Sequence, residues 1–331
     1  MNLYTKNIGK TFSGVNVLRN VNFTLEPGEV HALVGENGAG KSTFVKILSG
    51  VYTPTDGDIF LDNKKIKINT PIAAQKNGVS LIHQEPQSFS HLSVAENIFM
   101  GHMDGNNFSR VKWKDINKSS EKILSSIGLK IDPKNIMEGL SIADQQMIEI
   151  AGALSKNSKI LIMDEPTSPL TPNEVGKLFD IVNQLKAQGM AIIFISHRLE
   201  EIRSIANRVT IFRDGDLITT QKINEITNEE IIKYMIGRSI EDIDVKENDF
   251  LKKDEVILKV NNISQFGNFK NISFDLKKGE ILGFAGLVGA GRTEVAKTIF
   301  GAENYDEGDI YFKDNIISNK SPYEAIQKGF A

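Results

Sequence analysis

The stretch Gly35-Glu36-Asn37-Gly38-Ala39-Gly40-Lys41-Ser42-Thr43 decides the fold of this chain. It matches G-x-x-x-x-G-K-[ST], the phosphate-binding P-loop, and lies between a predicted buried strand at 29–34 and a predicted helix from 42 to 48. In this arrangement, backbone N–H groups and a helix N-terminus point at one place and favour negative charge there. Lys41 can reach outer phosphates, and Ser42 offers a hydroxyl to Mg²⁺. A Gly-rich turn would match by chance in on the order of one chain in a hundred, so we interpret the whole stretch as a nucleotide site.

Length and composition set broad limits. The chain has 331 residues, which permits two domains, and its 40% hydrophobic and 24% charged residues are typical of globular proteins. The net charge of −3 argues against nonspecific nucleic-acid binding, so we expect no nucleic-acid partner. The absence of cysteine excludes disulfides and Cys-ligated metal, and the five histidines show no metal-ligand spacing. Residues 1–10 have no secretory h-region and no apolar run is long enough for a membrane span, so we expect a soluble protein, or one held at a membrane by a partner.

A second copy of the loop follows at Gly286-Leu287-Val288-Gly289-Ala290-Gly291-Arg292-Thr293, an offset of 251 residues, with Arg292 where Lys41 stands. The same offset pairs Phe23 with Phe274, Gly28 with Gly279, Glu29 with Glu280, Gly57 with Gly308, Pro71 with Pro322, Ala74 with Ala325 and Gly78 with Gly329. This agreement indicates a duplicated domain. We predict a first domain at 1–237, a charge-rich linker at 238–255 and an incomplete second copy at 256–331, because Ala331 corresponds to Ser80.

Strand-like and helical segments alternate in the first copy. Predicted strands lie at 80–83, 159–163, 191–196 and 208–213, and helical patterns at 142–154, 172–187 and 231–235. Such alternation predicts an α/β sheet covered by helices. Shorter predicted strands and hairpins at 12–24 and 58–68 indicate an accompanying antiparallel β subdomain.

The apolar run Lys159–Met163 ends in two acids, Asp164 and Glu165. An apolar strand that ends in Asp next to a P-loop is the Walker B arrangement, in which Asp164 would hold Mg²⁺. Glu165 follows at a position where a carboxylate can polarise the attacking water as a general base. Taken alone, a buried strand before an acidic turn is the simpler interpretation, but the P-loop favours the catalytic one.

Four weaker candidates accompany these residues. His197 follows the apolar strand at 193–195 and could donate to a γ-phosphate, because parallel strands present their carboxyl ends to the ligand. Gln84 could place an amide oxygen on the metal, and Phe12 could stack on an adenine ring. Ser141 precedes a helical run and offers an anion-friendly helix N-terminus. The alternatives are a structural His, a solvated Gln, a core Phe and an ordinary N-cap.

In order along the chain, these residues resemble an ATP-binding cassette (ABC) ATPase. The matching motifs are the aromatic loop (Phe12), Walker A (Gly35–Ser42), the Q-loop (Gln84), the signature (Ser141, Ile142, Ala143, Asp144 and Gln145 within Leu140–Gln146), Walker B (Asp164, Glu165), the D-loop (Ser168–Thr171) and the switch His197. The resemblance implies a P-loop NTPase fold with a RecA-like core sheet, an antiparallel β subdomain and a helical subdomain, followed by the N-terminal part of a second cassette. It implies Lys41, Gln84, Glu165 and His197 as catalytic residues and Ser42, Gln84 and Asp164 as Mg²⁺ ligands.

The sequences of the two loops are similar to those of the fused double-cassette ATPases of bacterial monosaccharide importers of the ribose, xylose and galactose type. This resemblance implies ATP and Mg²⁺ as cofactors and a peripheral place at the cytoplasmic face of the membrane. It implies two transmembrane permease subunits, a periplasmic or lipid-anchored sugar-binding protein and a second cassette as partners. Permease helices would dock near 85–103, with apolar Phe89, Leu92, Ile98 and Phe99.

Two departures from the family pattern affect the expected activity. Ile142-Ala143 replaces the usual Gly-Gly of the signature, and Asp144 adds like charge near a phosphate. The second loop, whose candidate residues are Gly286, Gly289, Gly291, Arg292 and Thr293, has Arg in place of Lys, which is not a conservative change. In dimers of this family, each ATP lies between the Walker motifs of one cassette and the signature of the other. The altered signature of the first cassette and the altered loop of the second therefore belong to the same ATP site. We expect the other site to hydrolyse ATP, and this chain to bind ATP-Mg²⁺ but turn it over slowly because the second signature would lie beyond Ala331.

Alternative functions remain open at this stage. The segment His83-Gln84-Glu85-Pro86 differs from the sequence that we expect of ribose-type proteins at this place. Rhamnose, an autoinducer, a nucleoside or another small polar molecule therefore stays open as the transported cargo. A soluble ABC ATPase outside transport, such as a ribosome-acting factor, is a second class, although the short linker speaks against it. A regulatory fragment without hydrolysis is a third.

Overall fold

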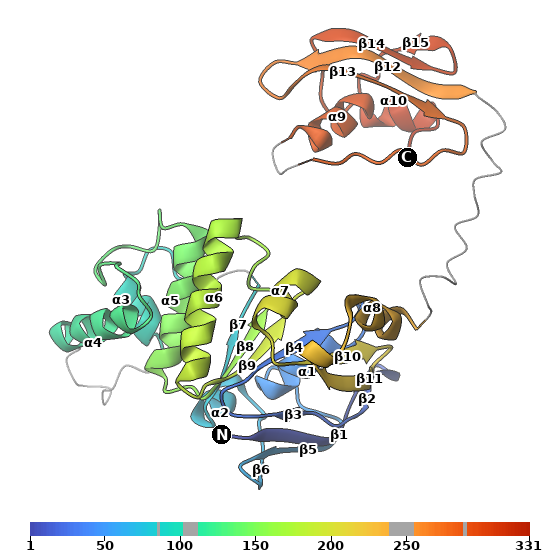
Figure 1. Ribbon diagram of the computed structural model, residues 1–331. Helices are drawn as coiled ribbons and strands as arrows, with labels where there is room; N and C mark the ends of the chain where they lie inside the picture. Colours follow the sequence, from blue (N-terminus) through green and yellow to red (C-terminus); the bar gives the residue numbers. More distant parts are fainter. Residues whose placement is uncertain (85–86, 102–111, 238–254, 287–289) are drawn as a thin grey trace. The chain divides into compact units, whose positions relative to one another are not determined.

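The computed structural model describes residues 1–84, 87–101, 112–237, 255–286 and 290–331. The chain divides into two compact units, Met1–Ile243 (unit 1) and Asp244–Ala331 (unit 2), which are described separately below (Figure 1). Apart from Glu255, the predicted linker at 238–255 lies outside the described residues, so the predicted domain boundaries stay a prediction.

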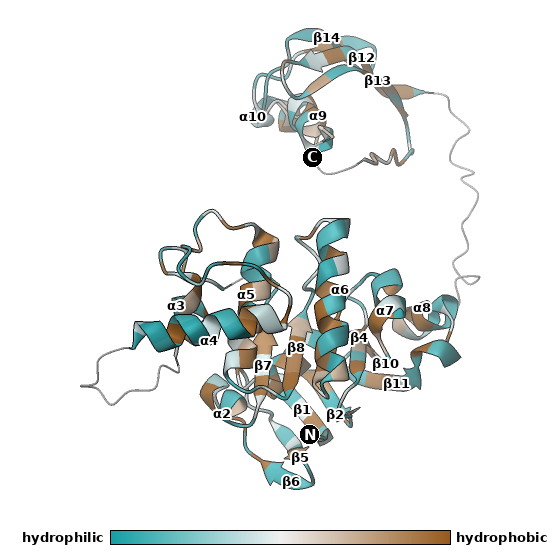
Figure 2. Ribbon diagram, turned by 60° about the vertical axis from the view of Figure 1, so that its left-hand side comes forward, coloured by the Kyte–Doolittle hydropathy of each residue, from teal (hydrophilic) through white to brown (hydrophobic). Residues whose placement is uncertain are grey.

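Parallel strands form the centre of unit 1. They lie side by side in the order β10 (Arg208–Arg213), β4 (Val30–Val34), β9 (Ala191–Ile195), β8 (Ile160–Asp164) and β7 (Val79–Ile82). Their sequences are apolar runs without alternation, as expected of strands buried on both faces, and β4 and β9 are buried at every position. Figure 2 shows the hydrophobic character of β7 and β8. The predicted α/β alternation is confirmed.

An antiparallel part continues the same sheet beyond β10. Its path runs through β11 (Asp216–Lys222), β2 (Val15–Val21), β1 (Leu3–Phe12), β5 (Asp56–Leu61) and β6 (Lys64–Ile66), and β3 (Thr24–Leu25) pairs with β1. The β11–β2 junction is a single parallel pair, Asp216 with Arg19, which an ion pair of 2.6 Å also joins. The predicted antiparallel subdomain is confirmed, and it shares one continuous sheet with the parallel core.

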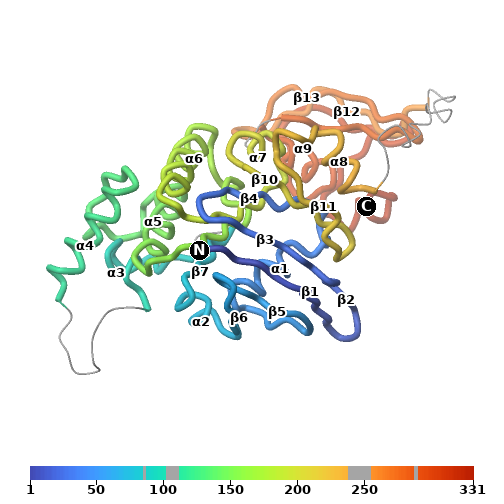
Figure 3. Tube along the Cα trace, turned by 60° about the horizontal axis from the view of Figure 1, so that its bottom comes forward, coloured from blue at the N-terminus to red at the C-terminus, as the bar shows by residue number. Residues whose placement is uncertain are grey.

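Helices cover both faces of this sheet and form a separate group at one side. They are α1 (Lys41–Leu48), α2 (Pro71–Lys76), α3 (Val94–Phe99), α4 (Trp113–Ser126), α5 (Ile142–Ser155), α6 (Pro172–Ala187), α7 (Leu199–Ile205) and α8 (Asn228–Ile236), with a 3₁₀ turn at Ile223–Glu225. Helices α3, α4 and α5 contact one another and lie on the side of unit 1 away from β1 and β2 (Figures 1 and 3). They correspond to the predicted helical subdomain.

Two apolar clusters sandwich the parallel strands. Alternate residues of β9 belong to different clusters, with Ile192 and Phe194 in one and Ile193 and Ile195 in the other. Because successive strand side chains point to opposite faces, the clusters lie on opposite faces of the sheet. Helix α1 contributes Phe44, whose ring lies 5.3 Å from that of Phe23 and 5.5 Å from that of Phe212. The helix that begins at the P-loop is therefore anchored in a packed core.

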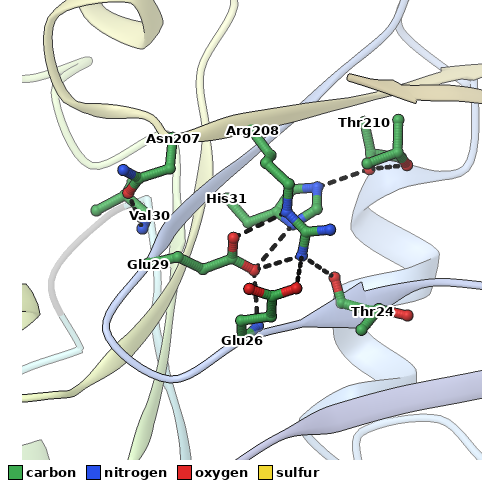
Figure 4. A network of polar contacts seen from close by, with 9 residues as sticks. Thr24, Glu26, Glu29, Val30, His31, Asn207, Arg208 and Thr210 are labelled. Carbon is green, nitrogen blue, oxygen red and sulfur yellow. Dashed lines mark hydrogen bonds and ion pairs between the residues drawn. The ribbon is translucent and has the colours of Figure 1, made fainter. Parts of the chain in front are cut away.

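A buried polar network ties β4 to β10 near the amino ends of both strands (Figure 4). Arg208 donates from Nε to Glu29 Oε2 at 2.9 Å and from Nη2 to Glu29 Oε1 at 2.7 Å. The His31 ring lies 2.7 Å from Thr210 Oγ1, and burial lowers the pKa of His31. Burial alone would raise the pKa of Glu29, but hydrogen bonds from His31, Arg208 and the Glu26 N–H lower it to about 2. Glu29 is therefore held as a carboxylate in the protein interior.

Unit 2 repeats the first part of unit 1. Its elements are β12 (Val256–Gln265), β13 (Phe269–Lys277), α9 (Arg292–Ile299), β14 (Glu307–Phe312), β15 (Asn315–Ile317) and α10 (Pro322–Gln327). The last four match α1, β5, β6 and α2 at an offset of 251 residues. Even turn conformations repeat, with φ of 86° at Gly57 and 97° at Gly308. The order and spacing of these backbone elements agree with the predicted internal duplication.

One repeated segment differs in structure. Residues 281–285 correspond to β4 but form no strand, and Ile281 is 98% exposed. In unit 1, β4 pairs with β10 on one edge and β9 on the other. The described part of unit 2 has no strand equivalent to either, so the backbone of this segment has no ladder partner.

Candidate functional site

The loop between β4 and α1 has a backbone that requires glycine. Gly35 has φ of 153°, and a Cβ there would lie 2.3 Å from the Phe212 carbonyl oxygen. Gly40 has φ of 103° and is the N-cap of α1, where a Cβ would lie 2.6 Å from Leu18 Cδ2. Gly38, with φ of 85°, faces open space. The first two glycines thus let the loop pack against β10 and β2, and the third leaves its outer side open to a ligand.

The amino end of α1 is built to receive an anion. Because its N-cap is glycine, no side chain caps the helix, and the first-turn N–H groups have no partners within the helix. These groups carry the positive end of the helix dipole. Ser42 and Thr43 lie in this first turn. The P-loop predicted from sequence therefore has the geometry of a phosphate site.

Lys41 folds back over the loop. Its Nζ donates to the Gly35 carbonyl at 2.7 Å and to the Glu36 carbonyl at 3.0 Å. Burial lowers the pKa of Lys41, while the charges of Glu165 and Asp164 raise it. The ammonium group is thus partly desolvated and interacts with the charges of two carboxylates. Its attraction to a phosphate would be stronger there than in bulk water, because the local dielectric constant is lower.

The register of the parallel sheet brings four loops to one edge. Ile195 at the end of β9 pairs with Leu33 of β4 and with Asp164 of β8. Ile82 at the end of β7 pairs with Met163. Because these strands are parallel, the segments that follow them emerge side by side. The P-loop, Gln84, Glu165 and His197 follow β4, β7, β8 and β9 respectively.

Glu165 is the meeting point of these loops. Its Oε2 lies 3.5 Å from Gln84 Nε2 and 3.5 Å from His197 Nδ1. Its backbone N–H donates to the Ile195 carbonyl at 3.0 Å, and its φ of 48° is in the left-handed region. The structure therefore brings together three of the four predicted catalytic residues, and Lys41 is linked to Glu165 through its charge.

Asp164 has the environment of a cation ligand. Burial and the neighbouring Glu165 charge raise its pKa, and the charges of Lys46, His83 and Lys41 lower it. Sequence reasoning missed Lys46 and His83, although Lys46 lies in the predicted helix after the P-loop and His83 directly precedes Gln84. A bound cation would relieve the repulsion between the two carboxylates.

The donor set fits Mg²⁺, which prefers oxygen ligands. Ser42 offers a hydroxyl, Asp164 a carboxylate, and Gln84, which uses its Nε2 toward Glu165, keeps its amide oxygen for a metal. Among the described residues, no group of three or more His, Cys, Asp or Glu side chains could hold a metal ion. Mg²⁺ usually keeps several water ligands and takes others from substrate phosphates, so the few oxygen donors named here suit it.

Phe12 lies at the end of β1 and is 36% exposed. Its ring meets the edge of Tyr52, with centroids 5.1 Å apart, and Lys10 Nζ lies 4.8 Å from its centroid. Lys10 is held there because it also donates to the Thr53 carbonyl at 2.8 Å. Sequence reasoning missed Tyr52 and Lys10. The aromatic candidate is thus a small surface cluster rather than a single ring.

Comparison with known proteins identifies the family. The sequence pattern of the ABC transporter family matches residues 18–168 and 269–330, more than half of the chain. The chain belongs to the ABC transporter family. Its match to the family in two segments agrees with the duplication, and the predicted cassette fold is confirmed.

Relatives in the ABC transporter family include import proteins. The chain is similar to the ribose import ATP-binding protein of Clostridium tetani, at 48% identity over 99% of this chain and 65% of the relative. It is 44% identical to a ribose import ATP-binding protein of Streptomyces avermitilis, with the same coverage, and 45% identical to the galactose/methyl galactoside import ATP-binding protein of Clostridium perfringens, over 64% of that protein. The chain thus spans about two thirds of the length of these relatives.

Solved ABC cassettes share the fold. A nucleotide-free ATP-binding cassette from an ABC transporter matches with a TM-score of 0.62 and 26% identity, covering 72% of this chain and 96% of that one. The ADP conformation of MJ1267, an ATP-binding cassette of an ABC transporter, matches with a TM-score of 0.64 and 25% identity, covering 72% of this chain and 100% of that one. Whole cassettes therefore match this chain.

The segment that resembles the ABC signature lies at the start of α5. Ser141 Oγ accepts from the Asp144 N–H at 3.1 Å and donates to Asp144 Oδ2 at 2.9 Å. Ala143 is buried, Ile142 is half exposed, and Gln145 accepts a hydrogen bond from Ser88 at 3.0 Å. Within this chain Ser141 is thus an N-cap, and the segment belongs to the helical subdomain, not to the strand ends that carry the other candidates.

The second loop has the backbone of the first in part. Gly291 is the N-cap of α9 with φ of 80°, and Arg292 and Thr293 begin that helix as Lys41 and Ser42 begin α1. Gly286 is described, whereas Gly289 lies outside the described residues.

The described part of the chain contains no helix that could span a bilayer.

Proposed function

We propose that unit 1 binds ATP with Mg²⁺ and hydrolyses the anhydride bond between its β- and γ-phosphates. The observation that carries this proposal is that the loops of Gln84, Glu165 and His197 meet at the Glu165 carboxylate, next to a P-loop whose Lys41 and helix N-terminus face the same edge of the sheet. Phosphoryl transfer to water requires positioning and charge neutralisation more than covalent help, and these residues supply both.

Each residue has a distinct part in the proposed mechanism. The P-loop N–H groups and Lys41 bind the phosphate oxygens and neutralise their charge. Glu165 accepts a hydrogen bond from the attacking water and takes its proton, and His197 donates toward the γ-phosphate. Ser42, Gln84 and Asp164 would hold Mg²⁺, which would add positive charge at the β- and γ-phosphate oxygens. Phe12 offers its ring to the adenine base.

We further propose that the chain is the ATP-binding part of a bacterial importer for a monosaccharide of the ribose or galactose type. The relatives named as ribose and galactose/methyl galactoside import proteins support this cargo class. The proposal includes two transmembrane permease subunits, a periplasmic or lipid-anchored sugar-binding protein and a peripheral place at the cytoplasmic face of the membrane. Other cargo, such as rhamnose, an autoinducer or a nucleoside, and a soluble ABC ATPase outside transport are the alternatives.

A cavity of about 320 Å³ lies beside the segment where permease helices are expected to dock. The predicted apolar contact residues do not all face outward. Phe89 is 56% exposed and lines the cavity, but Ile98 is fully buried and Phe99 packs on the same core. The expectation that Ile98 contacts a partner is therefore wrong, because α3 uses that side to hold α5. Of this predicted segment, residues 85–86 and 102–103 lie outside the described residues.

Unit 2 is proposed to be part of a second cassette, fused to the first. Its repeated backbone and its Arg292 in place of Lys41 support a composite dimer in which the site with the altered signature and the altered loop is the weaker one. The strong site would need a signature from a second cassette. The proposal therefore predicts that the 331-residue chain binds ATP but turns it over slowly.

Nucleotide binding is the direct test. Titration of the full chain with a fluorescent ATP analogue and Mg²⁺ should give saturable binding that Lys41→Ala weakens strongly and that Lys64→Ala, at an exposed position of β6, does not. Equal affinity in Lys41→Ala and the unmodified chain would refute the site. Recovery of permease subunits from membranes, rather than co-sedimentation with ribosomes, separates the importer from the non-transport alternative.

A further inference from the structure

Glu201 is a buried carboxylate to which the proposed mechanism gives no part. It lies in the first turn of α7 and is only 8% exposed. Its Oε2 accepts hydrogen bonds from Thr167 Oγ1 and Ser196 Oγ, both at 2.7 Å. Its Oε1 accepts from Arg198 at 3.2 Å. A buried charge with hydrogen bonds of this kind is kept in place by its partners and in turn holds them.

The two hydroxyl groups on Glu201 stand next to the reacting residues. Thr167 follows Glu165 by two residues, and Ser196 directly precedes His197. One oxygen atom of Glu201 therefore joins the loop after β8 to the turn after β9. Ser196 Oγ also accepts from the Arg198 N–H at 3.0 Å, which fixes the turn that carries His197.

Glu165 and His197 need such support because they do not hold each other. Their closest side-chain atoms are 3.5 Å apart, which is longer than an ordinary hydrogen bond. Glu165 also has φ of 48°, in the left-handed region that is sterically unfavourable for a residue with a side chain. Such a conformation persists where the surrounding structure enforces it. The direct backbone bond from Glu165 to Ile195 and the bridge through Glu201 are the contacts that do so.

We propose that Glu201 is a positioning residue that acts through Thr167 and Ser196 to set the separation of the Glu165 carboxylate and the His197 imidazole. The structural part of this inference stands on the hydrogen bonds alone. Its kinetic part rests on the function proposed above, because the separation matters for turnover only if Glu165 and His197 act on a nucleotide.

Histidine NMR tests the structural part without any nucleotide. The full chain is labelled with ¹⁵N-histidine, and the His197 signals are assigned as those missing from His197→Gln. Glu165→Gln should move the His197 signals, which calibrates the contact. Glu201→Gln should move them in the same direction, because it keeps the side-chain volume but removes the charge and sets an NH₂ group against either the Arg198 guanidinium or the two hydroxyls. Glu200→Gln, at an exposed carboxylate in the same helical turn, should leave them in place.

Thr167→Val is a second variant for the case that Glu201→Gln does not fold. It removes one hydroxyl, and the Glu201 carboxylate keeps its hydrogen bonds from Ser196 and Arg198. It should reproduce the shift of Glu201→Gln. The proposal is overturned if Glu201→Gln and Thr167→Val leave the His197 signals at their unmodified positions. It is equally overturned if Glu165→Gln moves nothing, because the pair would then not be in contact.

Kinetics test the second part. The slow turnover expected of the full chain with ATP and Mg²⁺ is followed as phosphate release over long times. Glu201→Gln should lower its kcat by about 10- to 100-fold, the size of effect that a small misplacement of reacting groups produces, while KM and the affinity for a fluorescent ATP analogue stay unchanged. Glu200→Gln should leave both constants unchanged. Unchanged kcat in Glu201→Gln would overturn the positioning role in turnover. If the unmodified chain binds no nucleotide, the proposed function fails, and the NMR result still decides whether Glu201 sets the pair.

Discussion

The buried pair of Glu29 and Arg208 gives a prediction of defined size. Removing Glu29 or Arg208 should destabilise unit 1 at neutral pH, because the bidentate bonds of 2.7 and 2.9 Å hold the charged form of Glu29. The side chains of Glu29 and Arg208 are only 9% and 22% exposed, so solvent screens the pair little. We expect Arg208→Met to have the larger effect, since it leaves a buried carboxylate without its main partner.

The magnitude follows from the pKa of Glu29, which falls from 4.5 to about 2 in the folded protein. At about 1.36 kcal/mol per pKa unit, this shift corresponds to about 3 kcal/mol of folding stability. Because the folded pKa is depressed, this contribution is present above pH 4.5 and is lost as the pH falls through 2. Stability should therefore decrease with acid in the unmodified chain and decrease less in Glu29→Gln.

Urea unfolding followed by tryptophan fluorescence measures this effect. Trp113 is the single tryptophan of the chain and lies in α4, so the signal reports on unit 1. Arg208→Met, Glu29→Gln and the double variant are compared at neutral pH and near pH 3, and the double variant should be more stable than Arg208→Met because it carries no unpaired carboxylate. The reasoning is refuted if Arg208→Met lies within about 0.5 kcal/mol of the unmodified chain, or if Glu29→Gln loses as much stability in acid as the unmodified chain does.

Three further predictions concern the site and its surroundings. Gly35→Ala should abolish ATP-analogue binding or folding, because its Cβ would lie 2.3 Å from the Phe212 carbonyl oxygen. Gly38→Ala meets no atom and should still fold, at the smaller cost of placing a side chain at φ of 85°; circular dichroism and binding titration check both. Glu165→Gln in a complete double-cassette relative should keep ATP binding and lose most turnover, and unchanged phosphate release would count against its role. Burial raises the pKa of Glu149 from 4.5 to about 7, so its contribution to stability is present below pH 4.5 and is lost as the pH rises through 7. At pH 8, Glu149→Gln should therefore unfold at a higher urea concentration than the unmodified chain. At pH 4 it should not.

Elements with strong local signals could be predicted from the sequence. The strand Arg208–Arg213 and the helix Pro172–Ala187 have the predicted bounds, because one is an apolar run and the other begins with Thr171, Pro172 and a capping box to Glu174. Helices α4 and α7 were not predicted. Helix α4 is amphipathic but mostly polar and buries only Ser120 and Leu124 within its length, so no run of apolar residues marks it in the sequence, and α7 is a short connection between two strands.

The candidate site divides in the same way. The P-loop could be located because its glycines and its helix start are consecutive in sequence. Lys46, His83 and Glu201 were missed, because each acts on the site through space from another element. The segment of unit 2 that corresponds to β4 forms no strand, because a strand needs neighbours, and the described part of unit 2 supplies none at that place.

The phosphate loop, the repeated segments and the order of the motifs follow from the amino-acid sequence alone. These features depend on residues adjacent in the chain or on a constant offset, and they need no knowledge of what packs against them. Only the tertiary structure decided that Gln84, Glu165 and His197 meet at one oxygen atom and that Glu201 ties Thr167 to Ser196. The register of parallel strands far apart in sequence sets these contacts, and that register depends on side-chain packing on both faces of the sheet.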